Sequence, residues 1–303
     1  MARPLAIAVL AGPTASGKTR LAVEVARRLG AEIVSADSQQ VYRGLEVGTA
    51  KPTAEERAQV PHHLLDLAAP GEGMDAARWA ELADRAIADI AGRGRLPLVV
   101  GGTGLYLRAL LRGVVAAPGR DPALRARLEA EAARLGRPAL HARLAAVDPA
   151  AAARIRPNDL VRVIRALEIS AGGQTQSELF ATHGFRERRY RGRFLALLVP
   201  RDELHRRIEQ RARAIAEGGI LDEARWLLER FGGSLPKLPL GYAEAAECAQ
   251  GSFPVEELAR RIAVAHRRYA RRQLVWLRRE PEVEWLVPPF DAAFVAELCR
   301  SAP

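Results

Sequence analysis

The sequence has little cysteine and no long apolar run. The two cysteines, Cys248 and Cys299, show no CxxC spacing, which excludes a disulfide framework and a thiolate metal site and is typical of a reducing compartment. No apolar stretch approaches the roughly 20 residues that cross a bilayer, and no small-residue cleavage site follows the first apolar run. We therefore expect a soluble cytoplasmic protein without a membrane partner.

Acidic residues are in deficit, with 36 Asp and Glu against 46 Lys and Arg, a formal charge of +10 and a pI near 10.4. This balance indicates a polyanionic partner, and nucleic acid is the first candidate. Codon bias in a GC-rich genome, which favours Ala and Arg, is the alternative explanation.

The 303 residues, of which 49% are apolar, suffice for a large α/β domain with an insertion. Short apolar runs alternate with helical patterns such as Thr19–Leu29 and Ala76–Ala91, which predicts parallel strands buried on both faces. The fold class predicted is a doubly wound parallel α/β sheet of the P-loop type. Its strands are expected at Leu5–Ala11, Ala31–Ser35, His62–Leu67, Pro97–Val100, Phe194–Val199 and Val283–Val287.

Between Gly119 and Arg191 the alternation stops, and helical patterns interrupted by Pro122, Pro138, Pro149 and Pro157 take over. We predict an inserted all-helical domain over 119–191, with the catalytic core formed by 1–118 and 192–303.

A P-loop pattern follows the first predicted strand and opens a helix. It consists of Gly12, Pro13, Thr14, Ala15, Ser16, Gly17, Lys18 and Thr19. Loop N–H groups at a helix N-terminus converge on phosphate oxygens, Lys18 adds positive charge, and Thr19 is placed to ligate Mg²⁺. The pattern predicts a diphosphate- or triphosphate-bearing substrate, including nucleotides, and does not identify the group attached to the phosphates.

Asp37, Ser38, Gln39 and Gln40 follow the second predicted strand. Because ligands bind at the carboxyl ends of strands in such sheets, Asp37 is expected to face the P-loop as a general base. A helix cap or an indirect Mg²⁺ ligand is the alternative role. The two glutamine amides suit reading of a base edge.

Gly101–Tyr106 forms a glycine-rich turn after the fourth predicted strand, where an NTP-hydrolysing motor usually carries an acidic residue. Such a turn brings backbone and the Thr103 hydroxyl close to a ligand without negative charge, which suits a departing diphosphate. The alternative is a plain turn with Thr103 as N-cap.

Arg260–Arg279 contains eight arginines and no acidic residue. Helical spacing places Arg261, Arg268, Arg272 and Arg279 on one face and Ile262, Ala265, Tyr269 and Trp276 on another. We expect the basic face to contact phosphates, with a solvated surface as the alternative.

Taken in order, several segments resemble the bacterial tRNA dimethylallyltransferases, and the resemblance covers nearly the whole chain. They are the P-loop, Asp37–Tyr42, Val47–Pro52, His62–Asp66, Gly101–Tyr106, Pro157–Asp159 with Arg162 and Arg165–Glu168, Gly241–Tyr242, and Tyr269–Gln273 with Trp276.

This resemblance implies transfer of a dimethylallyl group from dimethylallyl diphosphate to the exocyclic N6 amine of the adenosine 3′-adjacent to the anticodon, with Mg²⁺ as cofactor. It implies that Asp37 accepts the amine proton, Thr103 binds the bridging oxygen of the diphosphate, and Lys18, the loop amides and Arg211 hold its charge. The residues that it implies in tRNA binding, with the anticodon stem-loop as partner, are Asp37, Ser38, Gln39, Gln40, Thr103, Arg125, Val161, Arg162, Val163, Ile164 and Arg165.

Three other activities stay open on sequence grounds. They are an adenylate isopentenyltransferase acting on free AMP, ADP or ATP, a small-molecule P-loop kinase, and a non-catalytic RNA-binding module. We expect the protein to be a monomer.

Overall fold

The computed structural model describes residues 4–184, 188–232 and 238–300. The chain forms two compact units, Met1–Leu111 with Arg188–Pro303, and Arg112–Glu187. The predicted insertion began and ended later, at 119 and 191. Arg189 and Arg191 belong with the core because their N–H groups bond to Leu111 O and Leu5 O, whereas Pro118 O accepts a bond from Arg165 inside the second unit.

The core of the first unit is a parallel sheet with the strand order β3-β2-β4-β1-β5-β6 in the described residues. All six apolar runs predicted as strands contain one, although the second and fourth strands extend one residue beyond the predicted C-terminal ends. These are β1 Ala8–Ala11, β2 Glu32–Ala36, β3 His62–His63, β4 Pro97–Gly101, β5 Phe194–Leu197 and β6 Val283–Leu286. The third is the shortest because Leu64 and Asp66 have φ of 65° and 56°, which turns the chain out of the sheet.

Helices cover both faces of this sheet, as the doubly wound class requires. Alternate strand residues point to opposite sides. Val9, Val34 and Val99 pack against α3 and α4, while Leu10, Ile33 and Leu98 pack against α1 and α14. The helices concerned are α1 Lys18–Leu29, α3 Ala76–Gly92, α4 Gly104–Arg112 and α14 Ala292–Arg300.

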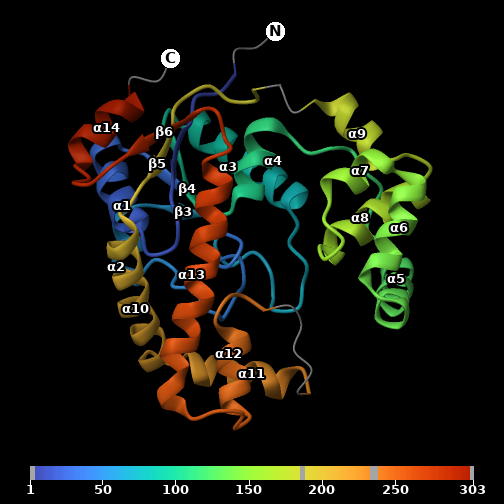
Figure 1. Ribbon diagram of the computed structural model, residues 1–303. Coiled ribbons are helices and arrows are strands. Elements are labelled where there is room, and N and C mark those ends of the chain that lie inside the picture. The colour runs from blue at the N-terminus through green and yellow to red at the C-terminus, as the bar shows by residue number, and fades with distance from the viewer. Residues whose placement is uncertain (1–3, 185–187, 233–237, 301–303) are drawn as a thin grey trace. The chain divides into compact units, whose positions relative to one another are not determined.

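A helical cluster continues the first unit beyond the sheet. It comprises α10 Arg201–Glu217, α11 Ile220–Arg230, α12 Tyr242–Ala249, the short η1 Val255–Glu257 and α13 Leu258–Leu277, with α2 Ala54–Gln59 elsewhere in the unit. Figure 1 shows α13 alongside α10 and α14 alongside α1, in agreement with their contacts. Leu204, Ile208, Leu227 and Ile262 form the shared core of the cluster.

The second unit has its own core, built on Leu128, Leu140, Leu144 and Val163. Its helices are α5 Pro122–Leu135, α6 Arg137–Val147, α7 Pro149–Arg154, α8 Leu160–Ala171 and α9 Gln176–His183. Pro122, Pro138 and Pro149 start α5, α6 and α7, because the first helical turn needs no backbone N–H.

No helix in the described part of the chain is both long and apolar enough to cross a bilayer.

Candidate active site

The P-loop links β1 to α1 in a tight turn. Ala15 and Gly17 adopt φ of 61° and 87°, and a Cβ on Gly12 would stand 2.8 Å from Ser16 Oγ. This close winding leaves the first-turn N–H groups of α1 directed out of the helix, where they form an anion-binding end.

Some P-loop groups already have protein partners. The Thr14 N–H donates to Gln273 Oε1 at 2.8 Å, and the Ser16 N–H donates to Pro13 O at 3.2 Å. Arg207 of α10 donates to Ser16 O at 3.2 Å. The Thr14 amide is therefore part of the loop's scaffold, although Thr14 itself lines the cavity described next.

One cavity brings together residues that are far apart in the sequence. Lys18 and Thr19 of α1, Asp37 after β2, Arg211 of α10 and Tyr269 of α13 line it. Burial lowers the pKa of Lys18 to about 8, against the opposing effect of Asp37. Burial also lowers the pKa of Arg211. Two desolvated cations beside the P-loop make this cavity a site for a multiply charged anion.

Asp37 is held by the turn that follows it, because its Oδ1 accepts the Gln39 N–H at 2.9 Å. Opposite, the Thr103 Oγ1 accepts the Ser38 N–H at 2.9 Å, and the Tyr269 hydroxyl hydrogen-bonds with Thr103 and Ser38. Burial raises the pKa of Tyr269 to about 12, so the phenol stays protonated. Hydrogen bonds between Ser38 and Thr103 thus join the turn after β2, which carries the Asp37 carboxylate, to the turn after β4.

The glycines of the turn after β4 have a packing role that the sequence did not show. A Cβ on Gly102 would stand 2.2 Å from Gln273 Nε2, and one on Gly104 would stand 2.1 Å from Trp276 Cδ2. The turn is glycine-rich because α13 lies directly on it.

Gln39 and Gln40 differ in their hydrogen-bond partners. Gln40 is buried and bonds to Ser35 Oγ and Ala50 O at 3.1 Å each, so its amide holds the loop together. Gln39 accepts the Leu240 N–H at 2.6 Å. The segment Lys237–Leu240 lies partly outside the described residues, which resume at Leu238.

The buried stripe of α13 differs from the predicted one. It runs through Ile262, His266, Gln273 and Leu277, rather than through Ala265 and Trp276. Sequence reasoning placed Tyr269 only on the apolar face and gave no site role to His266 or Gln273, although their helical spacing on one side of a basic helix was a usable signal.

The arginines of α13 divide into paired and unpaired groups. Arg261 bonds to Glu257 and stacks over Phe253 at 3.8 Å, and Arg267 bonds to Glu209 at 2.9 Å. Arg268 and Arg271 form no ion pair within the described residues.

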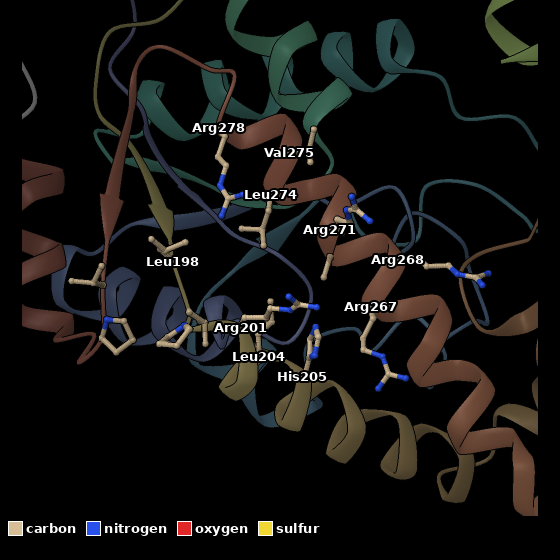
Figure 2. A pocket seen from close by; sticks show the side chains of 15 residues that line it. Leu198, Arg201, Leu204, His205, Arg267, Arg268, Arg271, Leu274, Val275 and Arg278 are labelled. Atoms are coloured by element: carbon tan, nitrogen blue, oxygen red, sulfur yellow. The ribbon is translucent and has the colours of Figure 1, made fainter. Parts of the chain in front are cut away.

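A basic groove of about 1050 Å³ lies between α10, α13 and the segments after β5 and β6. Leu198, Leu204 and Leu274 contribute apolar side chains to it, and none of its described lining residues is a carboxylate. Figure 2 shows basic side chains from both helices around it. They are Arg201, His205, Arg267, Arg268, Arg271 and Arg278.

Of the tRNA-binding residues expected in the second unit, some are exposed and others are buried or already bonded within the protein. Arg125 bonds to both carboxylate oxygens of the buried Glu168, at 3.1 and 2.7 Å. Val163 and Ile164 are buried in the unit's core, which excludes side-chain contact with RNA in this conformation. Arg165 donates to Pro118 O at 2.7 Å. Val161 is 65% exposed and the Arg162 side chain is 72% exposed, so these two present the free surface.

Comparison with known proteins places this site in a family. The sequence profile described as "IPP transferase" matches residues 40–280. A tRNA dimethylallyltransferase of Anaeromyxobacter sp. (strain Fw109-5) is 73% identical, with 94% of this chain and 95% of that protein covered. The tRNA dimethylallyltransferase of Myxococcus xanthus is 51% identical, over 99% and 97%.

Solved structures agree with the sequence comparison. The full-length tRNA isopentenylpyrophosphate transferase from Bacillus halodurans has a TM-score of 0.69 at 38% identity, covering 97% of both chains. A eukaryotic dimethylallyltransferase, described as acting on tRNA, has a TM-score of 0.78 at 27% identity, over 93% of this chain and 74% of its own. The chain therefore belongs to the IPP transferase family.

Proposed function

We propose that this enzyme is a tRNA dimethylallyltransferase. It transfers a dimethylallyl group from dimethylallyl diphosphate to the exocyclic N6 amine of the adenosine 3′-adjacent to the anticodon, in tRNAs that read codons beginning with U. The observation that carries the proposal is the convergence of Lys18, Arg211 and Asp37 on one cavity beside the P-loop.

The charges of this cavity suit an allylic diphosphate. Lys18, Arg211 and the first-turn amides of α1 hold the diphosphate, and Thr103 donates its hydroxyl proton to the bridging oxygen. Thr103 already donates to Ser38 Oγ at 3.2 Å, so a short rotation redirects this proton. Hydrogen bonds to the leaving group lower the barrier because they strengthen as its charge grows.

Asp37 acts on the other reactant. The adenosine N6 attacks C1 of the allyl group, the C1–O bond breaks with its electron pair leaving on the diphosphate, and the carboxylate takes the N6 proton. The Gln39 N–H holds the carboxylate toward the cavity. A positioned base is needed because an exocyclic amine is a weak nucleophile.

Mg²⁺ fits this site through the Thr19 hydroxyl, which lines the cavity beside Lys18. The described residues contain no cluster of three or more His, Cys, Asp or Glu side chains able to hold a metal ion by themselves. Mg²⁺ commonly takes one or two protein oxygens plus substrate phosphates, and bound in this way it would neutralise diphosphate charge.

The tRNA anticodon stem-loop is the proposed partner of two surfaces. The target base, taken out of its stack, is placed against Ser38, Gln39 and Tyr269 at the cavity edge. Phosphates are assigned to the basic groove and to the exposed Arg162 of the helical insertion.

The test incubates the protein with labelled dimethylallyl diphosphate, Mg²⁺ and unmodified tRNA in the absence of ATP. We expect label in the tRNA and none in AMP, ADP or ATP offered alone. Label in free nucleotide but not in tRNA would identify an adenylate isopentenyltransferase. ATP-dependent phosphorylation of a small molecule without prenyl transfer would identify a kinase.

A further inference from the structure

His266 is a buried imidazole for which the proposed reaction has no role so far. It is 3% exposed and lines the cavity with Lys18 and Arg211. Neither ring nitrogen has a hydrogen-bond partner in the described part of the chain. Since about nine in ten buried polar groups are hydrogen-bonded, two unpaired nitrogens on one buried ring call for an explanation.

The surroundings of the ring are cationic. Arg211 of α10 lowers the pKa of His266 further, after the larger effect of burial, and together they bring it to about 3. The imidazole is therefore neutral and carries one N–H donor. The neutral ring lines the same cavity as Lys18 and Arg211 without adding to the repulsion between these two cations.

Gly241 lies beside the His266 ring. This residue has φ of 93° and forms the N-cap of α12, and a Cβ there would stand 3.9 Å from His266 Nε2. The N-terminal end of α12 also bears partial positive charge. The ring nitrogen Nε2 thus lies near a helix end that favours an anion.

Resting on the proposed function, we infer that His266 is a further diphosphate-binding residue, whose imidazole N–H donates to an oxygen of the diphosphate beside Arg211. A neutral donor in the cavity of two cations adds a hydrogen bond to the anion without adding to the cations' repulsion in the free enzyme. The adenine base is a weaker candidate for this bond, because a donor gains more from an anionic acceptor than from a neutral one.

Two substitutions separate hydrogen bonding from packing. His266→Phe keeps a planar ring and removes both nitrogens, whereas His266→Gln keeps an N–H donor. With inorganic diphosphate and Mg²⁺ as probe, titration calorimetry should show affinity about tenfold weaker for His266→Phe and within about threefold of wild type for His266→Gln. His183→Phe, in α9 and outside the lining of the cavity, is the matched control and should bind as wild type.

A spectroscopic measurement serves if His266→Phe does not fold. In wild-type protein with ¹⁵N-labelled histidine, the imidazole signal that disappears in His266→Gln should shift when diphosphate is added. Wild-type affinity in folded His266→Phe, or an unshifted signal under saturating diphosphate, overturns the inference and returns His266 to a packing role.

Failure of the proposed function has a different signature. Because the probe is diphosphate alone, absence of tRNA labelling with intact diphosphate binding rejects the transfer reaction and leaves the inference standing. Lost binding in Lys18→Ala but not in His266→Phe keeps the P-loop site and rejects His266 alone.

Discussion

The Thr14 N–H and the Gln273 Oε1, from residues 259 positions apart in the chain, form a buried hydrogen bond of 2.8 Å. The same Gln273 amide donates to Gly102 O at 3.0 Å. One side chain of α13 therefore holds the P-loop against the turn that carries Thr103, and so sets the spacing between the proposed diphosphate site and the Thr103 hydroxyl.

Gln273→Leu should weaken diphosphate binding and stability together. It leaves the Thr14 N–H and the Gly102 carbonyl buried without partners, which costs about 1–3 kcal/mol of unfolding free energy per group. Chemical denaturation and diphosphate titration measure both effects. Gln210→Leu, on the exposed side of α10, is the matched control. Unchanged diphosphate affinity in Gln273→Leu would show that the bridge does not shape the P-loop.

Asp37→Ala should reduce prenyl transfer by about 10²–10⁴-fold, the usual contribution of a general base. Diphosphate affinity should stay near wild type, because the cations that hold the anion remain. Single-turnover transfer and diphosphate titration test the two statements separately. Retained transfer would remove the base role, and lost diphosphate binding would mean that Asp37 organises the cavity instead.

Diphosphate affinity should fall as the pH rises above about 8. The pKa of Lys18 is lowered to about 8 in the free enzyme, so the ammonium is lost above this pH, while a bound anion favours its charged form. The loss approaches tenfold per pH unit. Lys18→Arg is titrated in parallel with the same ligand. The arginine side chain stays charged over this pH range, so the diphosphate affinity of this variant should fall less with pH than that of wild type. Identical curves would assign the pH effect to the ligand.

Arg268→Gln with Arg271→Gln should weaken tRNA binding and flatten its salt dependence. These two arginines line the groove without ion pairs in the described chain, and each phosphate contact contributes about 0.7–0.9 to the slope of log K against log salt. Filter binding across a salt series measures the slope. The control is Arg27→Gln with Arg28→Gln, an exposed pair on α1 away from the groove lining. An unchanged slope would make the groove a solvated surface.

Much of the fold could be predicted because its signals are local. The runs around Val9 and Val99 are short and apolar at every position, as expected of a strand covered on both faces. The P-loop pattern predicts the strand-to-helix turn around Gly17.

The unpredicted part depends on partners distant in the sequence. Arg125 was expected to contact RNA, but in the fold it bonds to Glu168. Gln40 was expected to contact a base, but its amide bonds to Ser35 and Ala50. Because α13 carries arginines on several sides, its sequence does not indicate which side faces the core. The buried face with His266 and Gln273 is visible only in the folded structure.

The bond between Thr14 and Gln273 also concerns the order of synthesis. The phosphate-binding motif leaves the ribosome well before the side chain that completes its shape, because Gln273 follows Thr14 by 259 positions. A nascent or truncated chain that ends before α13 contains the full P-loop motif but lacks the Gln273 side chain that bonds to it. Such a fragment should therefore be unable to sequester diphosphates before the rest of the enzyme exists.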